Sequence, residues 1–486
     1  MVRITNKNNV DNKRKHYNRK KKLRDYKKIH FLAKLTDTNE AFNVLFNMFS
    51  SIFGSEATNI QIHLLLLVLG MLVTNESKSV LSLFTKFIGK YSGYKLNSFY
   101  YTLQKAEHVK GDWVRIILRM VLTINMKRSP GASGRPIEIQ IDDTLVEKIG
   151  EHFDGYAKQH DHTNRNGTNY LYGNCFVGIT IKLPIEDGRV KYIKFPIAIR
   201  MWEKEEQKSK LKLAEETIRL IVDVIREIYP DVKIFIECDA WYTKGEIKDL
   251  VDLENVDIIG AVRNNTVMHE VDLPPKTGKR GRPANYKRVY KDDIELKEIP
   301  GSDYCIGHKE VRTPLFGMEK IVRIFATKKK NGKEIRLFIC TDPNGYPDLD
   351  LNLLENDSSK AMVEYDINLV PIAMYKSRWT IEVMFYEHKK FWGLQDYFVR
   401  NKEEIEAILN LELIVYTCLT ILPYIHEQFS GLAAIESIQT RRFEVGQFIY
   451  KIISLNKFDE ECCISKDFPE VSEIIKKAMS NISLSA

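Results

Sequence analysis

The chain has 486 residues, of which 44% are hydrophobic, and a formal net charge of +8 at pH 7. It can bury a large core and is long enough for roughly two to four domains. The basic charge balance favours an anionic partner, and nucleic acid is commoner than a membrane for such a balance. The seven cysteines include no C-x-x-C pair, which argues against a disulfide framework or a zinc knuckle.

We expect no segment for secretion or membrane insertion. The first residues are polar and basic, without an apolar core region or a small-residue cleavage site. The most apolar run, Leu64–Val73, is too short to span a bilayer and is typical of a buried helix. Together with the scattered cysteines, these features predict a cytoplasmic protein.

Residues 1–28 form a polar, strongly basic segment that includes Lys20, Lys21 and Lys22. A block of like charges repels itself, so we expect this segment to be disordered when free. It would act either as an arm that contacts DNA phosphates or only as a solubilising tail, and we favour the arm.

Residues 29–130 are predicted to be a helical DNA-binding domain. Apolar residues recur at helical spacing in several segments between Ala41 and Ile124. The segments Val80–Ile88 and Ser98–Glu107 lie on either side of a tight turn and resemble a helix-turn-helix, whose second helix could enter a major groove. This signal has little specificity, because most small helical bundles contain such a pair.

After a linker at 129–134, the hydrophobic period changes from that of a helix to that of a strand. Ile137–Ile141 alternates strictly and predicts a strand that ends at Asp142 and Asp143. The polar stretch Gly155–Thr168 is expected to be a loop. Later strands are predicted at Tyr170–Leu183, Val190–Ile199, Val232–Glu237 and Asp257–Val262, and helices at Glu205–Ile228 and from Lys244. This order predicts a mixed α/β sheet, whose first part is residues 131–262.

Residues 263–346 are predicted to be a β-rich insertion. Several short strand-like segments follow a basic, glycine-rich loop at Lys276–Pro283. Arg280 and Arg282 of this loop resemble the core of a hook that reads an A·T minor groove, although a solvated hairpin tip has the same composition. The α/β domain then resumes at residues 347–425, and residues 426–486 are expected to be a helical C-terminal region.

The stretch from Tyr375 to Lys389 is predicted to be helical, because neither Pro nor Gly interrupts it. On a regular helix Tyr375, Arg378, Glu382 and Lys389 fall within a sector of about 60°, and Met384 and Phe391 pack inward on the other side. One face thus presents a carboxylate between a phenol and two cations. An amphipathic helix with ordinary ion pairs would show the same pattern.

Three acidic positions favour a functional reading of this helix. Asp142 and Asp239 each end a predicted strand, and the carboxyl ends of strands in an α/β sheet are where sites form. With Glu382 they would make a cluster of like charges that is stable only with a cation. Hard oxygen ligands without His or Cys suit Mg²⁺ or Mn²⁺, and two such ions catalyse phosphoryl transfer.

The chain resembles bacterial insertion-sequence transposases that have an RNase H-like DDE domain and a YREK signature. Tyr375, Arg378, Glu382 and Lys389 match that signature at full spacing. The segments at Asp142-Asp143-Thr144 and Asp239-Ala240-Trp241-Tyr242 are similar to the first and second acidic motifs, and their register favours Asp142 over Asp143 as the ligand. The resemblance spans roughly Ile137–Asp396 and includes the β-rich insertion.

This resemblance implies a DNA transposase with an RNase H-like catalytic domain. Asp142, Asp239 and Glu382 would hold two Mg²⁺ ions, and Arg378, Lys389 and Tyr375 would contact phosphates. The enzyme would cleave at the terminal inverted repeats of its element and transfer the freed 3′-hydroxyl into target DNA. It would work as a homodimer that bridges two DNA ends, and it would lie on the bacterial nucleoid when bound to DNA.

Two other functions fit the same residues. An RNase H-like nuclease without strand transfer uses the same carboxylates, so the sequence does not separate it sharply from a transposase. A domesticated DNA-binding protein would have lost catalysis, and the intact acidic motifs argue against it.

Overall fold

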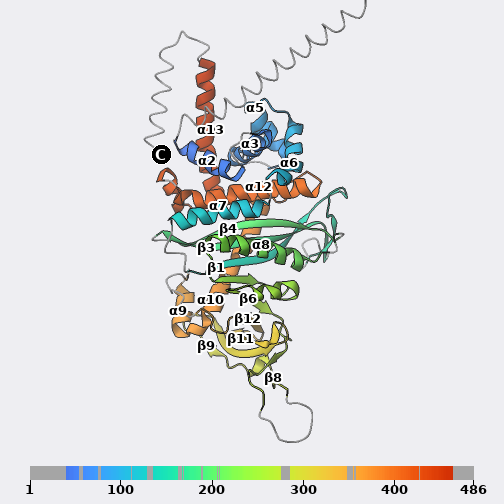
Figure 1. Cartoon of the computed structure of the whole chain (residues 1–486), viewed down its shortest axis with the longest axis vertical. Helices are drawn as coiled ribbons and strands as arrows, with labels where there is room; N and C mark the ends of the chain where they lie inside the picture. Colours follow the sequence, from blue (N-terminus) through green and yellow to red (C-terminus); the bar gives the residue numbers. More distant parts are fainter. Residues whose placement is uncertain are drawn as a thin grey trace, which may run out of the picture. The chain divides into compact units, whose positions relative to one another are not determined.

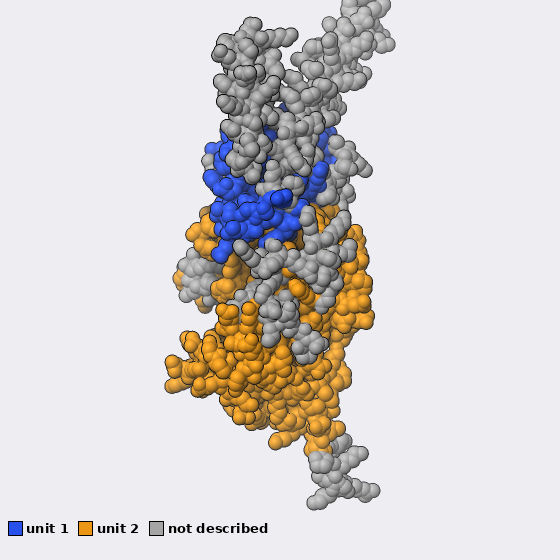
Figure 2. Space-filling view, turned by 90° about the vertical axis from the view of Figure 1, so that its left-hand side faces the viewer, with its two compact units in different colours: residues 1–111, 396–399, 421–486 blue, residues 112–395, 400–420 orange. Residues whose placement is uncertain are grey.

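The computed structural model describes residues 40–53, 58–74, 78–110, 112–128, 135–161, 167, 169–187, 190–204, 206, 208–274, 285–346, 354, 357–425 and 427–462. The chain forms two compact units, which Figure 2 shows in different colours. The first comprises residues 1–111, 396–399 and 421–486, and the second residues 112–395 and 400–420. The basic segment with Lys20, Lys21 and Lys22, and the loop with Arg280 and Arg282, lie outside the described residues.

The first unit is helical in its described part. Its elements are α2 (Glu40–Phe53), α3 (Asn59–Val73), α4 (Val80–Leu83), η1 (Phe84–Ile88), α5 (Gly89–Tyr91), α6 (Leu96–Lys110), η9 (Leu422–Tyr424), η10 (Glu427–Ala434) and α13 (Ile438–Cys462). Thr58 begins α3 through a capping box with Gln61. At the other end of α3, the buried Arg442 guanidinium of α13 donates to the carbonyls of Met71 and Thr74. The helices expected here are present, and their DNA-binding role stays a prediction.

The second unit is built on one mixed sheet (Figure 1). Its strands are β1 (Ile137–Glu147), β2 (Ala157–His160), β3 (Tyr170–Asp187), β4 (Val190–Trp202), β5 (Ile234–Cys238), β6 (Val256–Val262), β7 (Met268–His269), β8 (Arg288–Val289), β9 (Lys297–Glu298), β10 (Tyr304–Thr313), β11 (Gly317–Lys329) and β12 (Ile335–Cys340). The strand order is β2-β3-β1-β5-β6-β12-β11-β10-β7-β8, with β4 on β3 and β9 on β10. β1, β5 and β6 run parallel, and the other pairs are antiparallel. This is the mixed α/β sheet expected of an RNase H-like fold.

The helical elements of this unit are α7 (Trp113–Arg128), α8 (Lys210–Ile228), η3 (Gly245–Asp252), η4 (Lys291–Asp293), α9 (Asp357–Tyr365), η6 (Ile367–Leu369), α10 (Val370–Tyr375), η7 (Lys376–Arg378), α11 (Trp379–Glu387), η8 (His388–Trp392) and α12 (Lys402–Ile421). Lys402–Tyr424 is long and apolar enough to cross a membrane, but it is mostly buried. Within it, Thr417 donates to the Pro196 carbonyl and Glu406 accepts from the Met201 amide, so α12 is a core helix against β4.

Two predictions about the first strands were wrong. β1 does not end at Asp142, because its antiparallel pairing with β3 continues to Glu147. Only its parallel pairing with β5 stops earlier, at Gln140 and Glu237. The second error is the expected loop at Gly155–Thr168, in which residues 157–160 form the edge strand β2. Polar side chains are compatible with an edge strand, because one of its faces can remain in water.

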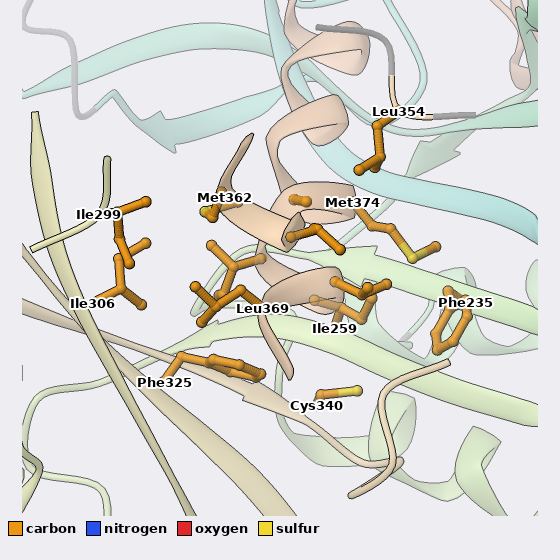
Figure 3. Close-up of a cluster of buried hydrophobic side chains, with 14 of the residues drawn as sticks. Phe235, Ile259, Ile299, Ile306, Phe325, Cys340, Leu354, Met362, Leu369 and Met374 are labelled. Atoms are coloured by element: carbon orange, nitrogen blue, oxygen red, sulfur yellow. The ribbon is translucent and has the colours of Figure 1, made fainter. Parts of the chain in front are cut away.

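The β-rich insertion continues the central sheet, because β12 pairs with β6. A hydrophobic cluster joins this extension to the helices that follow it. Figure 3 shows Leu369 and Met374 of the helices in the same cluster as Ile259 and Cys340 of the sheet. The cluster thus holds α10 against the sheet, and α10 leads directly into the signature residues.

We call the continuous helical run Val370–Trp392 the signature helix. The expected helix is present, but its winding changes from α to 3₁₀ at η7, back to α in α11, and to π at η8. The 3₁₀ turn η6, which Asp366 caps, precedes this run, and Pro371 lies in the first turn of α10. The inward position predicted for Phe391 was wrong. Phe391 is 38% exposed and Trp392 is buried, because a π turn shifts the helix face by about one residue.

The signature helix approaches the sheet closely at Gly178 of β3. A Cβ atom at this position would lie 2.5 Å from two ring atoms of Phe385. Real Cβ atoms do not come so near a ring, so α11 can pack at this depth only over a glycine.

We predict that Gly178→Ala destabilises the protein by about 1–3 kcal/mol, because the added methyl group overpacks the contact with Phe385. Urea denaturation followed by circular dichroism measures the loss. Gly431→Ala is a matched control, since a Cβ there meets nothing within 4 Å. In the double variant Gly178→Ala/Phe385→Leu the smaller side chain should recover part of the loss, and additive effects would contradict this account.

Candidate active site

Two aspartates lie close together, one on β1 and one just after the end of β5. β1 and β5 run parallel with Gln140 opposite Glu237, and Asp142 and Asp239 each follow two residues later. Because side chains alternate along a strand, the Asp142 carboxylate lies on the face that carries Gln140 and Glu237. Asp239 follows the end of β5 and is close enough that its charge raises the pKa of Asp142. The backbone amides of Trp241 and Tyr242 donate to Asp239 Oδ1, each at 2.9 Å, and fix its orientation at the end of β5.

Arg378 connects this pair to the signature helix. Its Nη1 lies 3.1 Å from Asp142 Oδ2, and its Nη2 lies 2.7 Å from Glu382 Oε1. Although burial opposes the charge, the neighbouring Tyr375, Asp142 and Glu382 hold the pKa of Arg378 above its usual value. Residues from distant parts of the sequence therefore lie close together here, and their role as metal ligands stays a prediction.

The surroundings raise the pKa of Asp142 from 3.8 to about 6. Burial is the largest cause, and the charges of Asp239 and Asp143 add to it, whereas Arg378 opposes it. Asp142 is thus a desolvated carboxylate near two other carboxylates, and a bound cation would offset this repulsion.

Asp143 lies on the opposite face of β1 with a separate set of partners. Lys210 at the start of α8 forms an ion pair with Asp143 Oδ2 at 2.7 Å, and Tyr242 donates to Oδ1 at 3.3 Å. The Cys175 thiol also donates to this carboxylate, at 3.4 Å. Sequence reasoning missed Lys210, because no spacing links it to the acidic motifs. Of the two adjacent aspartates, Asp142 is the one that faces Arg378.

The two outer signature residues have different surroundings. The Tyr375 hydroxyl donates to the Cys238 carbonyl at 3.2 Å, and burial raises its pKa well above the ordinary value. This bond joins α10 to the end of β5, next to Asp239. Lys389 lies further along the signature helix, on the π turn η8, and is half-buried.

The donor set fits a hard divalent cation, with one adjustment. Carboxylate oxygens without His or Cys suit Mg²⁺ or Mn²⁺. As they are arranged here, no group of three or more His, Cys, Asp or Glu side chains among the described residues converges on a metal position. The Arg378 guanidinium instead spans Asp142 and Glu382 and supplies the positive charge. Asp142, Asp239 and Glu382 would therefore have to exchange Arg378 for the metal.

Comparison with known protein families agrees with this geometry. Residues 49–302, just over half of the chain, match the family model of the DDE superfamily endonucleases. The chain belongs to this DDE superfamily. Residues 214–418 also match the transposase DDE domain, so the two matches together include Asp142, Asp239 and Glu382. No curated protein gives a significant match. Enzymes of the DDE superfamily act on DNA as nucleases or transposases and generally use divalent metal ions.

In this DDE enzyme we predict a pH-dependent stability that comes from Asp142. A pKa raised from 3.8 to about 6 means that the folded state holds the proton more tightly than the unfolded state does. The contribution of Asp142 to the free energy of unfolding therefore falls as the pH rises from about 4 to about 6. Asp142→Asn lacks this titration. In the metal-free protein its free energy of unfolding should therefore rise by up to about 3 kcal/mol relative to that of wild type over this range.

Denaturant titrations between pH 4 and 7.5, in EDTA at constant ionic strength, measure this difference. Glu216→Gln is a control, since Glu216 is an exposed carboxylate on α8. If the curves of Asp142→Asn and wild type stay parallel across the range, the raised pKa of Asp142 is contradicted.

Proposed function

We propose that this DDE enzyme is a DNA transposase of the group with the YREK signature. It would cleave at the terminal inverted repeats of its element and join the freed 3′ ends to target DNA. The observation that supports this is the double ion pair of Arg378, which brings Glu382 of α11 to Asp142 of β1, next to Asp239. Arg378 of the signature thus connects Asp142 of the first acidic motif with Glu382 of the signature.

The reaction would take place in two phosphoryl transfers. In the first, water attacks the phosphorus at the element end, the bond from phosphorus to the 3′ oxygen breaks, and a 3′-hydroxyl is released. In the second, that hydroxyl attacks a phosphodiester bond of the target, and the target's own 3′ oxygen leaves. Each step forms one P–O bond and breaks one, so no oxidant or energy source is needed.

Asp142, Asp239 and Glu382 would bind two Mg²⁺ or Mn²⁺ ions. When bound, such ions activate the attacking oxygen and offset the negative charge on the leaving oxygen. Arg378, once released from the carboxylates, would hold a phosphate near the cut by charge-assisted hydrogen bonds. Lys389 would bind a second phosphate as a point charge. Tyr375 could donate to a phosphate only if its hydroxyl left the Cys238 carbonyl.

Other parts of the chain would recognise and pair the DNA ends. The helical region before residue 130, the basic segment with Lys20–Lys22, and Arg280 and Arg282 of the insertion would contact DNA outside the cut. Both ends of an element must be cut in one event, so we propose a homodimer on DNA. The enzyme would act in the cytoplasm, on the nucleoid.

We predict that Glu382→Gln abolishes cleavage while it leaves DNA binding largely intact. The amide keeps the shape of the side chain but removes a negative metal ligand. Purified protein, Mg²⁺ and DNA that carries the inverted repeats from the flanks of its gene provide the assay, with binding measured by gel shift. Cleavage by Glu382→Gln at the wild-type rate would exclude Glu382 from catalysis.

The same assay separates the three candidate functions. A transposase yields cut ends joined to target DNA, and a nuclease yields cut ends alone. A domesticated DNA-binding protein binds without cutting in any divalent metal.

We further predict that Arg378→Ala and Lys389→Ala weaken binding to end DNA and reduce its salt dependence. Each lost phosphate contact should make the slope of log K against log salt shallower by about one unit, since fewer counterions are released. Fluorescence anisotropy over a salt series measures the slope. Lys248→Ala, at an exposed position on η3, serves as the control. An unchanged slope in both variants would remove Arg378 and Lys389 from the phosphate-binding role.

A further inference from the structure

A layer of buried polar side chains lies directly behind the proposed catalytic carboxylates. Its members are on the same sheet face as Asp142, one or two pleats away from it, on β1 and on the neighbouring strands β3 and β5. They carry two carboxylates and one ammonium group, although this part of the sheet is covered. The members are Glu138, Gln140, Thr180, Lys182 and Glu237, all buried.

Side chains of neighbouring strands satisfy one another within this layer. Lys182 Nζ lies 2.8 and 3.0 Å from the two carboxylate oxygens of Glu138. Thr180 Oγ1 donates to Gln140 Oε1 at 2.9 Å, and Gln140 Nε2 donates to Glu237 Oε2 at 3.0 Å. Buried polar groups without such partners would cost several kcal/mol each, so the layer is held in one arrangement.

Ser377 connects this layer to the signature helix. Its Oγ donates to Glu138 Oε2 at 2.8 Å and accepts from Gln140 Nε2 at 3.2 Å. The same atom lies 3.3 Å from Glu237 Oε2. One hydroxyl therefore contacts residues of two neighbouring parallel strands, β1 and β5.

The position of Ser377 within the helix gives this contact its importance. Ser377 lies in the 3₁₀ turn η7, immediately before Arg378. In a 3₁₀ turn successive side chains diverge by about 120°, so one residue can point into the sheet while the next points along it. Ser377 contacts the layer in this way, and Arg378 extends to Asp142 and Glu382.

We propose that Ser377 is a positioning residue, which fixes η7 on the polar layer and thereby sets Arg378 and Glu382 against Asp142. This role rests on the proposed phosphoryl transfer, because its benefit is the geometry of that site. A displacement of about 1 Å in such a site can reduce the rate a hundredfold. Ser377 does not touch the reacting atoms, and its effect passes through Arg378.

The test compares Ser377→Ala with Ser377→Thr, which keeps the hydroxyl. Ser358→Ala is a matched control, since Ser358 is exposed on the nearby helix α9. In single-turnover cleavage with saturating enzyme, Ser377→Ala should slow the reaction by about ten- to a hundredfold. Its affinity for end DNA should change by less than about threefold, because binding uses the whole interface. Ser377→Thr should restore most of the rate, and Ser358→Ala should match wild type.

A second measurement does not depend on activity. Hydrogen exchange of peptides that cover residues 376–387 should accelerate in Ser377→Ala, and not in Ser377→Thr, while exchange in α12 stays unchanged. Wild-type cleavage and wild-type exchange in Ser377→Ala would overturn the proposal. So would a loss of rate and binding together that Ser377→Thr does not recover, since this indicates a general folding defect. If wild-type protein cuts no DNA, the proposed function fails, and hydrogen exchange still decides the role of Ser377.

Discussion

The double ion pair of Arg378 is the interaction on which the site depends. Two carboxylates, Asp142 and Glu382, come from a central strand and from a helix more than two hundred residues later. A third, Asp239, lies close enough to raise the pKa of Asp142. Like charges at such distances repel unless a cation lies among them. The guanidinium provides that cation here. Its two ion pairs require Glu382 of α11 to lie near Asp142 of β1.

The sheet face beneath the signature helix is adapted to this requirement. At Gly178 the absence of a side chain lets the Phe385 ring approach the backbone of β3. Further along the same face, Glu138 and Glu237 are buried with one ammonium group, that of Lys182, beside them. Burial and the Glu138 carboxylate hold the pKa of Glu237 well above its usual range, so the layer avoids a second buried negative charge. The helix can therefore lie on a polar surface without leaving its groups unpaired.

Much of the site could be predicted from local patterns. The spacing of Tyr375, Arg378 and Glu382 indicated one helix face, and the register of the first acidic motif favoured Asp142 over Asp143. The difference in their surroundings depends on tertiary contacts, however, because Asp143 has Lys210 and Tyr242 from other elements as partners. The extension of β1 past Asp142 has the same kind of cause, since β3 supplies the pairing that continues it.

The polar layer was missed for a related reason. Glu138, Gln140 and Asp142 alternate with isoleucines, and such a strand is normally read as one apolar and one solvent-exposed face. Only the helix that covers this face makes its polar residues internal. Single-sequence periodicity does not contain that information, because the covering residue, Ser377, lies in a different part of the chain and carries no signal of its own.

The winding of the signature helix shows why a regular helical wheel was an incomplete guide. The 3₁₀ turn at η7 directs Ser377 and Arg378 to different targets, and the π turn at η8 brings Trp392 inward instead of Phe391. Burial lowers the pKa of His388 to about 4, so this ring is neutral and packs against Trp392 and Tyr416. These ring contacts lie at the π turn η8, which also carries Lys389. A π turn therefore lies between Glu382 and the end of the signature helix, and a regular helical wheel does not describe this spacing.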